Sequence, residues 1–312
     1  MRSSERPRWL RLAQWVVGLA IVGFAARSLI NNWEALRSQP LDFRIGPGWL
    51  ALSALLVWSM YVILIVAWRV MLAGWGQRLD GWGAARIWTV SSLGKYLPGK
   101  VWAVAGMALM AQRAGVAPWA ATGSAVVLQV LAIGTGAAIA GLTGRRAIEA
   151  AHPGAQAVLL LLVLASVLGV ALLLWPPVLR RLLQLTAPGA DHRGAPPVGG
   201  IAVGIVANAL AWIGYGAALW LLARGLLPSV GLRPALAVAV FTASYLAGFL
   251  ALFAPGGIGV REGLFILMLQ GPLGIGAATA LAVASRLLLT LTELGAAVPF
   301  LILPQGRARV AP

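Results

Sequence analysis

The sequence predicts an all-α polytopic membrane protein that is built as an inverted repeat of two halves. Three observations lead to this fold class: a low charge content, apolar runs of about twenty residues, and a second half that resembles the first. Of the 312 residues, 60% are hydrophobic and only 10% are charged, against roughly 25% charged in an average soluble domain. A helix needs about twenty apolar residues to cross a bilayer. An ordinary soluble enzyme is therefore excluded.

Hydrophobic segments follow one another along the chain, and some are too short to cross a membrane. Two short segments, 84–94 and 101–111, are joined by residues 95–100 and resemble one re-entrant hairpin. A third, 258–270, follows a Pro-Gly-Gly break. The longer segments are 10–30, 49–73, 119–142, 155–175, 201–223, 234–254 and 275–303.

The two breaks are related by an internal repeat. An offset of 157 residues superposes Pro98-Gly99 on Pro255-Gly256 and continues without a gap through Leu131 on Leu288. Each half then holds three long transmembrane helices and one broken or re-entrant helical hairpin. Because each half crosses an odd number of times, the second must be inserted upside down, as in many secondary transporters whose binding site lies where the broken helices meet.

The whole chain, 1–312, is expected to form a single transmembrane domain without a soluble domain. The repeats cover about 10–142 and 155–303, and the longest polar linker is 187–198. The net charge is +16, and with both termini cytoplasmic the basic loop residues divide twelve inside to six outside. We expect a multi-pass protein of the bacterial inner membrane, with nucleic acid excluded as a partner. A signal peptide within residues 1–26 is the less favoured interpretation.

The composition gives little support for a metal site or for thiol chemistry. The chain has no Cys, and its only two His, His152 and His192, stand in polar connections. No pair of a nucleophile and a base can be assembled, so we expect neither an enzyme nor a bound cofactor.

Charges are expensive at membrane depth, about 2.5 to 3.5 kcal/mol each on insertion scales, and so usually face a polar cavity. The only two lysines, Lys95 and Lys100, flank the Pro98-Gly99 break next to Tyr96. This placement favours a functional role over the alternative that both lysines snorkel to an interface.

The second break combines glycines with the start of a helix. Unpaired N–H groups at such a start attract an anion, and Arg261 in the first turn needs an anion or a carboxylate partner. Glu262 either caps the helix or serves in function. The candidate substrate-binding residues here are Pro255, Gly256, Gly257, Gly259, Arg261 and Glu262.

The last long segment places Arg286 and Glu293 on one helical face. The candidate ion pairs are Arg286 with Glu262 and Glu293 with Arg261, which could equally form a structural latch. In the first half the position that matches Arg286 is Gln129. The four cations and two carboxylates give the predicted cavity a charge of about +2, which suits an anionic molecule.

Residues 95–102 and 255–262, together with Arg286, resemble the flippase-like integral membrane family related to the transmembrane region of lysylphosphatidylglycerol synthase. The resemblance covers nearly the whole chain. It implies movement of a lipid between leaflets: an aminoacylated phospholipid in the best-known relatives, and a polyprenyl-phosphate-linked sugar or another anionic lipid in others. The chain lacks the relatives' Glu-Arg pair, reading Leu128-Gln129-Val130 instead. We expect no aminoacyl-transferring domain, so the resemblance does not imply synthesis of an aminoacyl lipid.

The resulting hypothesis is a translocase for an anionic or phosphate-bearing membrane lipid. One alternative is a secondary transporter of a small soluble anion. The other is a non-transporting partner of a lipid-linked glycosyltransferase or another envelope-synthesis protein. The oligomeric state stays open.

Overall fold

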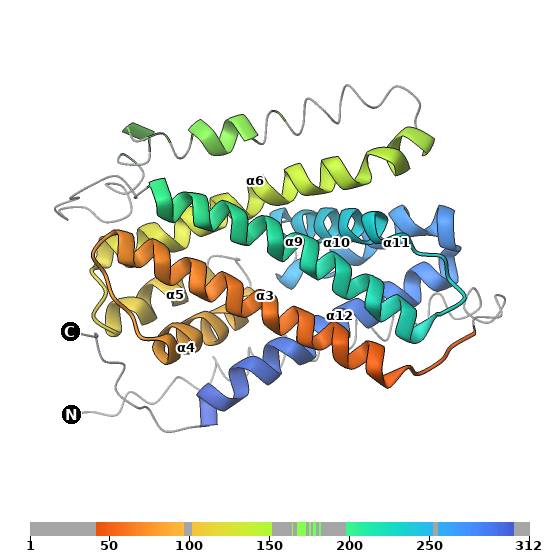
Figure 1. Cartoon of the computed structure of the whole chain (residues 1–312), viewed down its shortest axis with the longest axis horizontal. Helices are drawn as coiled ribbons and strands as arrows, with labels where there is room; N and C mark the ends of the chain where they lie inside the picture. Colours follow the sequence, from red (N-terminus) through yellow and green to blue (C-terminus); the bar gives the residue numbers. More distant parts are fainter. Residues whose placement is uncertain are drawn as a thin grey trace.

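The computed structural model describes residues 42–96, 102–151, 198–251 and 255–302, together with a few positions between 164 and 181. Within these ranges every regular element is a helix (Figure 1). The elements are α3 (Pro47–Gly74), α4 (Gly81–Ser92), η1 (Leu93–Tyr96), α5 (Trp102–Arg113), α6 (Pro118–Ala151), α9 (Val198–Leu226), α10 (Pro234–Leu250), η2 (Pro255–Gly257), α11 (Val260–Leu273) and α12 (Ile275–Ile302).

Four of these helices, α3, α6, α9 and α12, are long and apolar enough to cross a membrane. Each has 28 residues or more, and 28 residues of helix span about 42 Å at 1.5 Å per residue. Helix α10 is apolar but has only 17 residues. The chain is therefore a multi-pass helical membrane protein.

The apolar runs predicted the helices well and their ends less well. The run 119–142 belongs to a helix that continues to Ala151, because the polar residues that end an apolar run do not by themselves end a helix. The run 234–254 forms a helix that ends at Leu250. The two short segments of the first hairpin are 12-residue helices, α4 and α5.

Parts of the prediction lie outside the described residues. The segment 10–30 is among them, as are most of the segment 155–175 and all of the linker 187–198 except Val198. The inverted relation of the two halves and the re-entrant course of the hairpins stay predictions.

Several helix ends follow from local sequence. The Asp80 side chain accepts a hydrogen bond of 3.0 Å from the Gly83 backbone N–H and so caps α4. Helices α3 and α10 begin with proline, whose missing N–H costs nothing in a first turn. Gly274, at φ +82°, separates α11 from α12.

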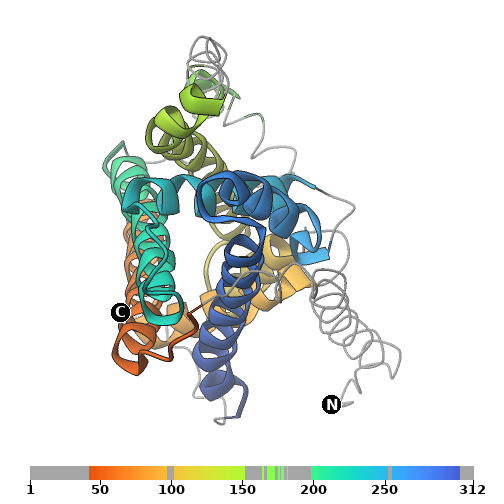
Figure 2. The same ribbon diagram turned by 90° about the vertical axis from the view of Figure 1, so that its right-hand side faces the viewer.

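Helices α3 and α9 pack side by side in opposite directions (Figures 1 and 2). The Gly46 N–H at the start of α3 donates to the Gly225 carbonyl near the end of α9 over 2.9 Å. Midway, the Ser53 hydroxyl donates to the Ala218 carbonyl over 2.7 Å. Small residues let the two backbones approach closely, as is common between membrane helices.

Gly216 on α9 permits the close approach of α10. A Cβ added there would lie 2.3 Å from the Val238 Cα, whereas one added at Gly199 on the same helix meets nothing within 4 Å. We expect Gly216→Ala to lower the free energy of unfolding by about 1 to 3 kcal/mol through overpacking. Gly199→Ala is the matched control and should melt like the wild type in detergent. Equal melting temperatures for the two variants would contradict this packing.

Several other contacts join elements of the first half to elements of the second half. Helix α6 packs on α10, and α4 packs on α12, while η1 touches η2. Helix α12 also lies against the α3–α9 pair (Figure 2). This arrangement brings the break after α4 and the break after α10 to one place inside the bundle.

Candidate functional site

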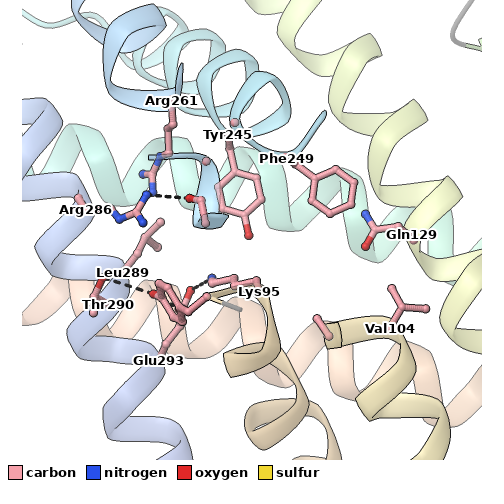
Figure 3. A pocket seen from close by; sticks show the side chains of 15 residues that line it. Lys95, Val104, Gln129, Tyr245, Phe249, Arg261, Arg286, Leu289, Thr290 and Glu293 are labelled. Carbon is pink, nitrogen blue, oxygen red and sulfur yellow. Dashed lines mark hydrogen bonds and ion pairs between the residues drawn. The ribbon is translucent and has the colours of Figure 1, made fainter. Parts of the chain in front are cut away.

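A cavity lies where the two breaks meet (Figure 3). The space in it that no protein atom fills is about 610 Å³, part of which is open to the surroundings. Its wall combines residues from η1, α5, α6, α10, η2, α11 and α12, so both halves of the sequence contribute. The polar lining residues include Lys95, Gln129, Tyr245, Arg261, Arg286 and Glu293.

Arg286 pairs with Glu262, as the sequence predicted. The Arg286 Nη1 lies 3.1 Å from the Glu262 Oε1 and also donates to the Gly256 carbonyl over 2.9 Å. The other oxygen of Glu262 accepts from the Gly259 N–H over 2.8 Å. Glu262 therefore caps the helix and also pairs with Arg286, whereas its role in function stays a prediction.

The turn before α11 depends on glycine. Gly256, Gly257 and Gly259 have φ values of +58°, +71° and +85°, which side chains rarely tolerate. Gly257 also lies against Gly248, because an added Cβ would be 2.8 Å from the Gly248 Cα. The chain thus passes tightly over α10 before it delivers Arg261 and Glu262 to the site.

We expect Glu262→Ala to destabilise the protein by about 3 kcal/mol, because it leaves the buried Arg286 without its carboxylate and removes the helix cap. Glu262→Gln should cost less, since its single amide oxygen can still accept from one of the two donors, the Gly259 N–H or the Arg286 guanidinium. Thermal unfolding of both variants in detergent checks this order. The reverse order would show that the ion pair and the cap contribute little.

Glu293 does not pair with Arg261, and that part of the prediction was wrong. Its carboxylate pairs instead with Lys95 and accepts a 2.7 Å hydrogen bond from the Tyr96 hydroxyl (Figure 3). Both partners lie on η1, which the packing of α4 against α12 brings beside Glu293. The ion pair is largely buried, with side-chain exposures of 26% for Lys95 and 7% for Glu293.

Arg261 is buried, with 6% of its surface exposed. Its Nη2 donates to the Ser285 hydroxyl over 3.0 Å, and its guanidinium lies 5.4 Å from the Phe241 ring and 5.6 Å from the Tyr245 ring. Within the described part of the chain, no carboxylate forms an ion pair with it. A buried cation is thus held by a hydroxyl and two aromatic rings.

Arg286 also has one N–H donor group that makes no hydrogen bond within the described residues. Its Nη2 is buried and has no hydrogen-bond partner among the described residues. Figure 3 places the two guanidinium groups, of Arg261 and Arg286, at the same end of the cavity. The two arginines therefore carry two positive charges at this end of the cavity. Glu262 offsets one of these charges.

A larger chamber continues from this cavity. Its unfilled space, part of which is open to the surroundings, is about 1350 Å³. It shares Lys95, Gln129, Tyr245 and Glu293 with the charged part. Its wall is mostly apolar and aromatic. The aromatic residues are Tyr61, Trp88, Trp212, Tyr215, Phe241, Tyr245 and Phe249.

The structure describes ten of the thirteen predicted site residues. Lys95, Tyr96, Gly256, Gly257, Arg261, Arg286 and Glu293 line the charged cavity; Gly259 and Glu262 support it through the cap and the ion pair, and Pro255 begins η2. Pro98, Gly99 and Lys100 lie outside the described residues.

The sequence reasoning missed Ser285, Phe241 and Tyr245. Phe241 and Tyr245 stand four residues apart on one face of an apolar helix, a spacing that was available but does not distinguish a cavity wall from a core. Of the residues that the structure describes, no group of three or more His, Cys, Asp or Glu lies close enough to hold a metal.

The fold and site define a multi-pass helical membrane protein with a charged cavity inside its bundle. The chain matches the family of the lysylphosphatidylglycerol synthase transmembrane region over residues 10–291. It therefore belongs to this family, as its two glycine breaks indicated. No curated protein matches the chain closely enough to count as a relative.

Proposed function

We propose that this protein is a translocase that moves an anionic, phosphate-bearing lipid between the two leaflets of the membrane, without catalysing a reaction. The observation that carries the proposal is Arg261, a buried cation on the cavity wall that no described carboxylate neutralises. A charge buried at membrane depth is costly unless a partner offsets it. An anionic ligand is the partner that the site lacks.

The local charge supports the same conclusion. Lys95, Arg261 and Arg286 face the carboxylates of Glu262 and Glu293. One positive charge is left over, and Arg286 offers a further free N–H donor. We propose that Lys100 adds a fourth cation when substrate is bound. Phosphate oxygens suit guanidinium donors because two parallel hydrogen bonds can form.

The continuity of the two spaces favours a lipid over a small soluble anion. A free phosphate would need only the charged cavity of about 610 Å³. The adjoining chamber is more than twice as large and mostly apolar, so the joined space can admit a group that is larger than a free phosphate. We propose that the headgroup occupies this joined space while its acyl or prenyl tails stay in the bilayer.

We propose an inverted repeat as the basis of the movement. The element order of α3 to α6 is repeated in α9 to α12, and the packing of α6 on α10 has its counterpart in that of α12 on α4. Rocking of two such halves would open the cavity to each leaflet in turn. In this proposal the breaks re-enter the membrane, both termini face the cytoplasm, and the protein resides in a bacterial inner membrane.

Reconstitution tests this function. The purified chain is placed in vesicles that contain a tail-labelled fluorescent phosphatidylglycerol, and dithionite then bleaches the label in the outer leaflet. We expect bleaching to proceed beyond the outer-leaflet fraction only when wild-type protein is present. The variant Arg261→Gln/Arg286→Gln should return it to the level of protein-free vesicles.

Two results would contradict the lipid assignment. Uptake of radiolabelled phosphate without lipid movement would make the protein a soluble-anion transporter. The other result combines two observations: folded wild-type protein is inactive in both assays, and Arg286→Ala does not fold. It would favour a non-transporting partner of an envelope-synthesis enzyme, in which the charged residues form a structural latch.

A further inference from the structure

Glu293 is a buried carboxylate to which the proposed function gives no task. Its side chain is 7% exposed, and its two oxygens accept from Lys95 and from the Tyr96 hydroxyl, both on η1. Among the described residues that line the charged cavity and the chamber, it is the only carboxylate. Glu262 lines neither space, and the Gly259 backbone N–H holds it in place. Of the two carboxylates, Glu293 is therefore the one that faces the proposed ligand.

Lys95 lies where it can serve either Glu293 or a bound anion. Its ammonium lies 5.9 Å from the centre of the Tyr245 ring, and the Arg261 guanidinium lies 5.6 Å from the centre of the same ring. Figure 3 shows Lys95, Arg261 and Arg286 around one space. A lysine has a flexible stem and rotatable donors, and this one is 26% exposed. A phosphate held by the two arginines would therefore compete with Glu293 for the Lys95 ammonium.

This competition links the anion to a proton. A buried carboxylate without a cation partner is costly, and it becomes neutral by taking up a proton. Two negative charges in one cavity also repel each other. Binding of the anion therefore favours protonated Glu293, and by reciprocity protonated Glu293 favours binding of the anion. The protonated side chain can still accept from the Tyr96 hydroxyl through its other oxygen.

The other groups around Glu293 do not offer a second place for this proton. The charged side chains that line the two spaces with it are Lys95 of η1, Arg261 of α11 and Arg286 of α12. The tyrosines are Tyr61 of α3, Tyr96 of η1, Tyr215 of α9 and Tyr245 of α10. Helix α4 also packs on α12, but its one titratable residue, Arg86, lines neither space. Lysine, arginine and tyrosine already carry their protons near neutral pH. Glu293 is thus the one described lining group that can gain a proton.

We infer that Glu293 is a proton-binding site coupled to the anionic ligand. It takes up one proton from water as the headgroup binds and Lys95 turns to the phosphate. It releases this proton to water when the headgroup leaves and Lys95 returns. Lipid and proton then cross the membrane together, so a proton gradient drives translocation. This inference rests on the proposed function, since it adds a driving ion to the same site.

Calorimetric titration of the full chain in detergent tests the coupling. The probe is short-chain phosphatidylglycerol, whose phosphodiester keeps one negative charge from pH 5 to pH 8. We expect its affinity to rise at least about tenfold from pH 8 to pH 5, since uptake of one proton gives at most about tenfold per pH unit. Titrations in two buffers of different ionisation enthalpy should show proton uptake that approaches one per lipid bound.

Substitutions locate the proton. Glu293→Gln resembles the protonated state, so it should bind phosphatidylglycerol without proton uptake and with an affinity that does not depend on pH. Asp42→Asn makes the matched change in the exposed ion pair with Arg44 and should behave like the wild type. Should Glu293→Gln fail to fold, Lys95→Met/Glu293→Gln, which leaves no buried charge unpaired, takes its place with the same expectation.

Vesicles that are acidic inside test the transport step. In the dithionite assay, we expect wild-type protein to carry labelled phosphatidylglycerol outward faster with the proton gradient than without it. A protonophore should remove this acceleration. Glu293→Gln should show no difference between the two conditions.

Two results overturn the inference in distinguishable ways. Binding of phosphatidylglycerol without proton uptake, or the pH dependence of the wild type in folded Glu293→Gln, would refute the proton site and leave the proposed function intact. Failure of phosphatidylglycerol to bind folded wild-type protein at any pH would contradict the proposed function as well.

Discussion

Replacing Arg261 by glutamine is expected to slow lipid translocation by about 10- to 100-fold while the protein stays folded. The side chain is buried, lines the cavity and has no carboxylate partner among the described residues. Its hydrogen bonds to an anionic ligand would contribute about 1.5 to 3 kcal/mol as charge-assisted bonds, and 1.4 kcal/mol is a factor of ten. Glutamine is polar but shorter than arginine, and it carries no charge.

Two further substitutions separate charge from geometry. Arg261→Lys keeps the charge and loses the forked donor, so it should retain an intermediate rate. Arg233→Gln removes a charge from an exposed arginine at the start of α10 and should translocate lipid at the wild-type rate. The rates come from the dithionite assay. A wild-type rate in folded Arg261→Gln would remove this residue from the substrate site.

Breaking the ion pair between Lys95 and Glu293 is expected to cost about 3 kcal/mol of stability. Removal of one partner leaves a buried, uncompensated charge, which typically costs 3 to 5 kcal/mol. The lower end applies here because the Lys95 side chain is 26% exposed. The pair joins η1 of the first half to α12 of the second, so its loss should also loosen the contact between the halves.

A double-mutant cycle measures this coupling. Lys95→Met and Glu293→Gln should each lower the melting temperature in detergent, and the double variant should lose less than the sum of the two, since no unpaired charge is left behind. Strictly additive losses would show that the two side chains do not depend on each other.

Much of the fold could be predicted because the bilayer imposes a simple rule. An apolar run of about twenty residues must become a helix, since lipid offers no partners for the backbone. The runs 49–73, 201–223 and 275–303 therefore correspond closely to α3, α9 and α12. Helix ends were less predictable because hydrogen bonding and capping set them, as at Ala151, which lies nine residues past the end of its apolar run.

The candidate site could be predicted where its contacts come from neighbouring elements. Arg286 and Glu262 lie on consecutive helices, and the position of Glu262 in a first turn already suggested a cap. The partner of Glu293 depends on how α4 packs against α12, almost 200 residues apart in sequence. The spacing of residues within one helix does not reveal this packing. The sequence therefore suggested Arg261 as the partner of Glu293, whereas the partner in the structure is Lys95.

The chamber could not be predicted from the sequence, for a related reason. Tyr245 and Phe241 look like ordinary residues of an apolar helix, and Gln129 was noticed only as a departure from the second half. Their shared orientation toward one space results from packing among α6, α9 and α10.

The most direct test of the central claim is the lipid that co-purifies with the protein. Wild type, Arg261→Gln and Arg233→Gln are purified in a mild detergent, and the lipids bound to each are extracted and quantified by mass spectrometry. We predict that one class of phosphate-bearing lipid is retained by wild type and Arg233→Gln and is strongly depleted in Arg261→Gln. Equal amounts of the same lipids in all three proteins would contradict a phosphate site at Arg261 and leave the intramembrane charges as structural contacts.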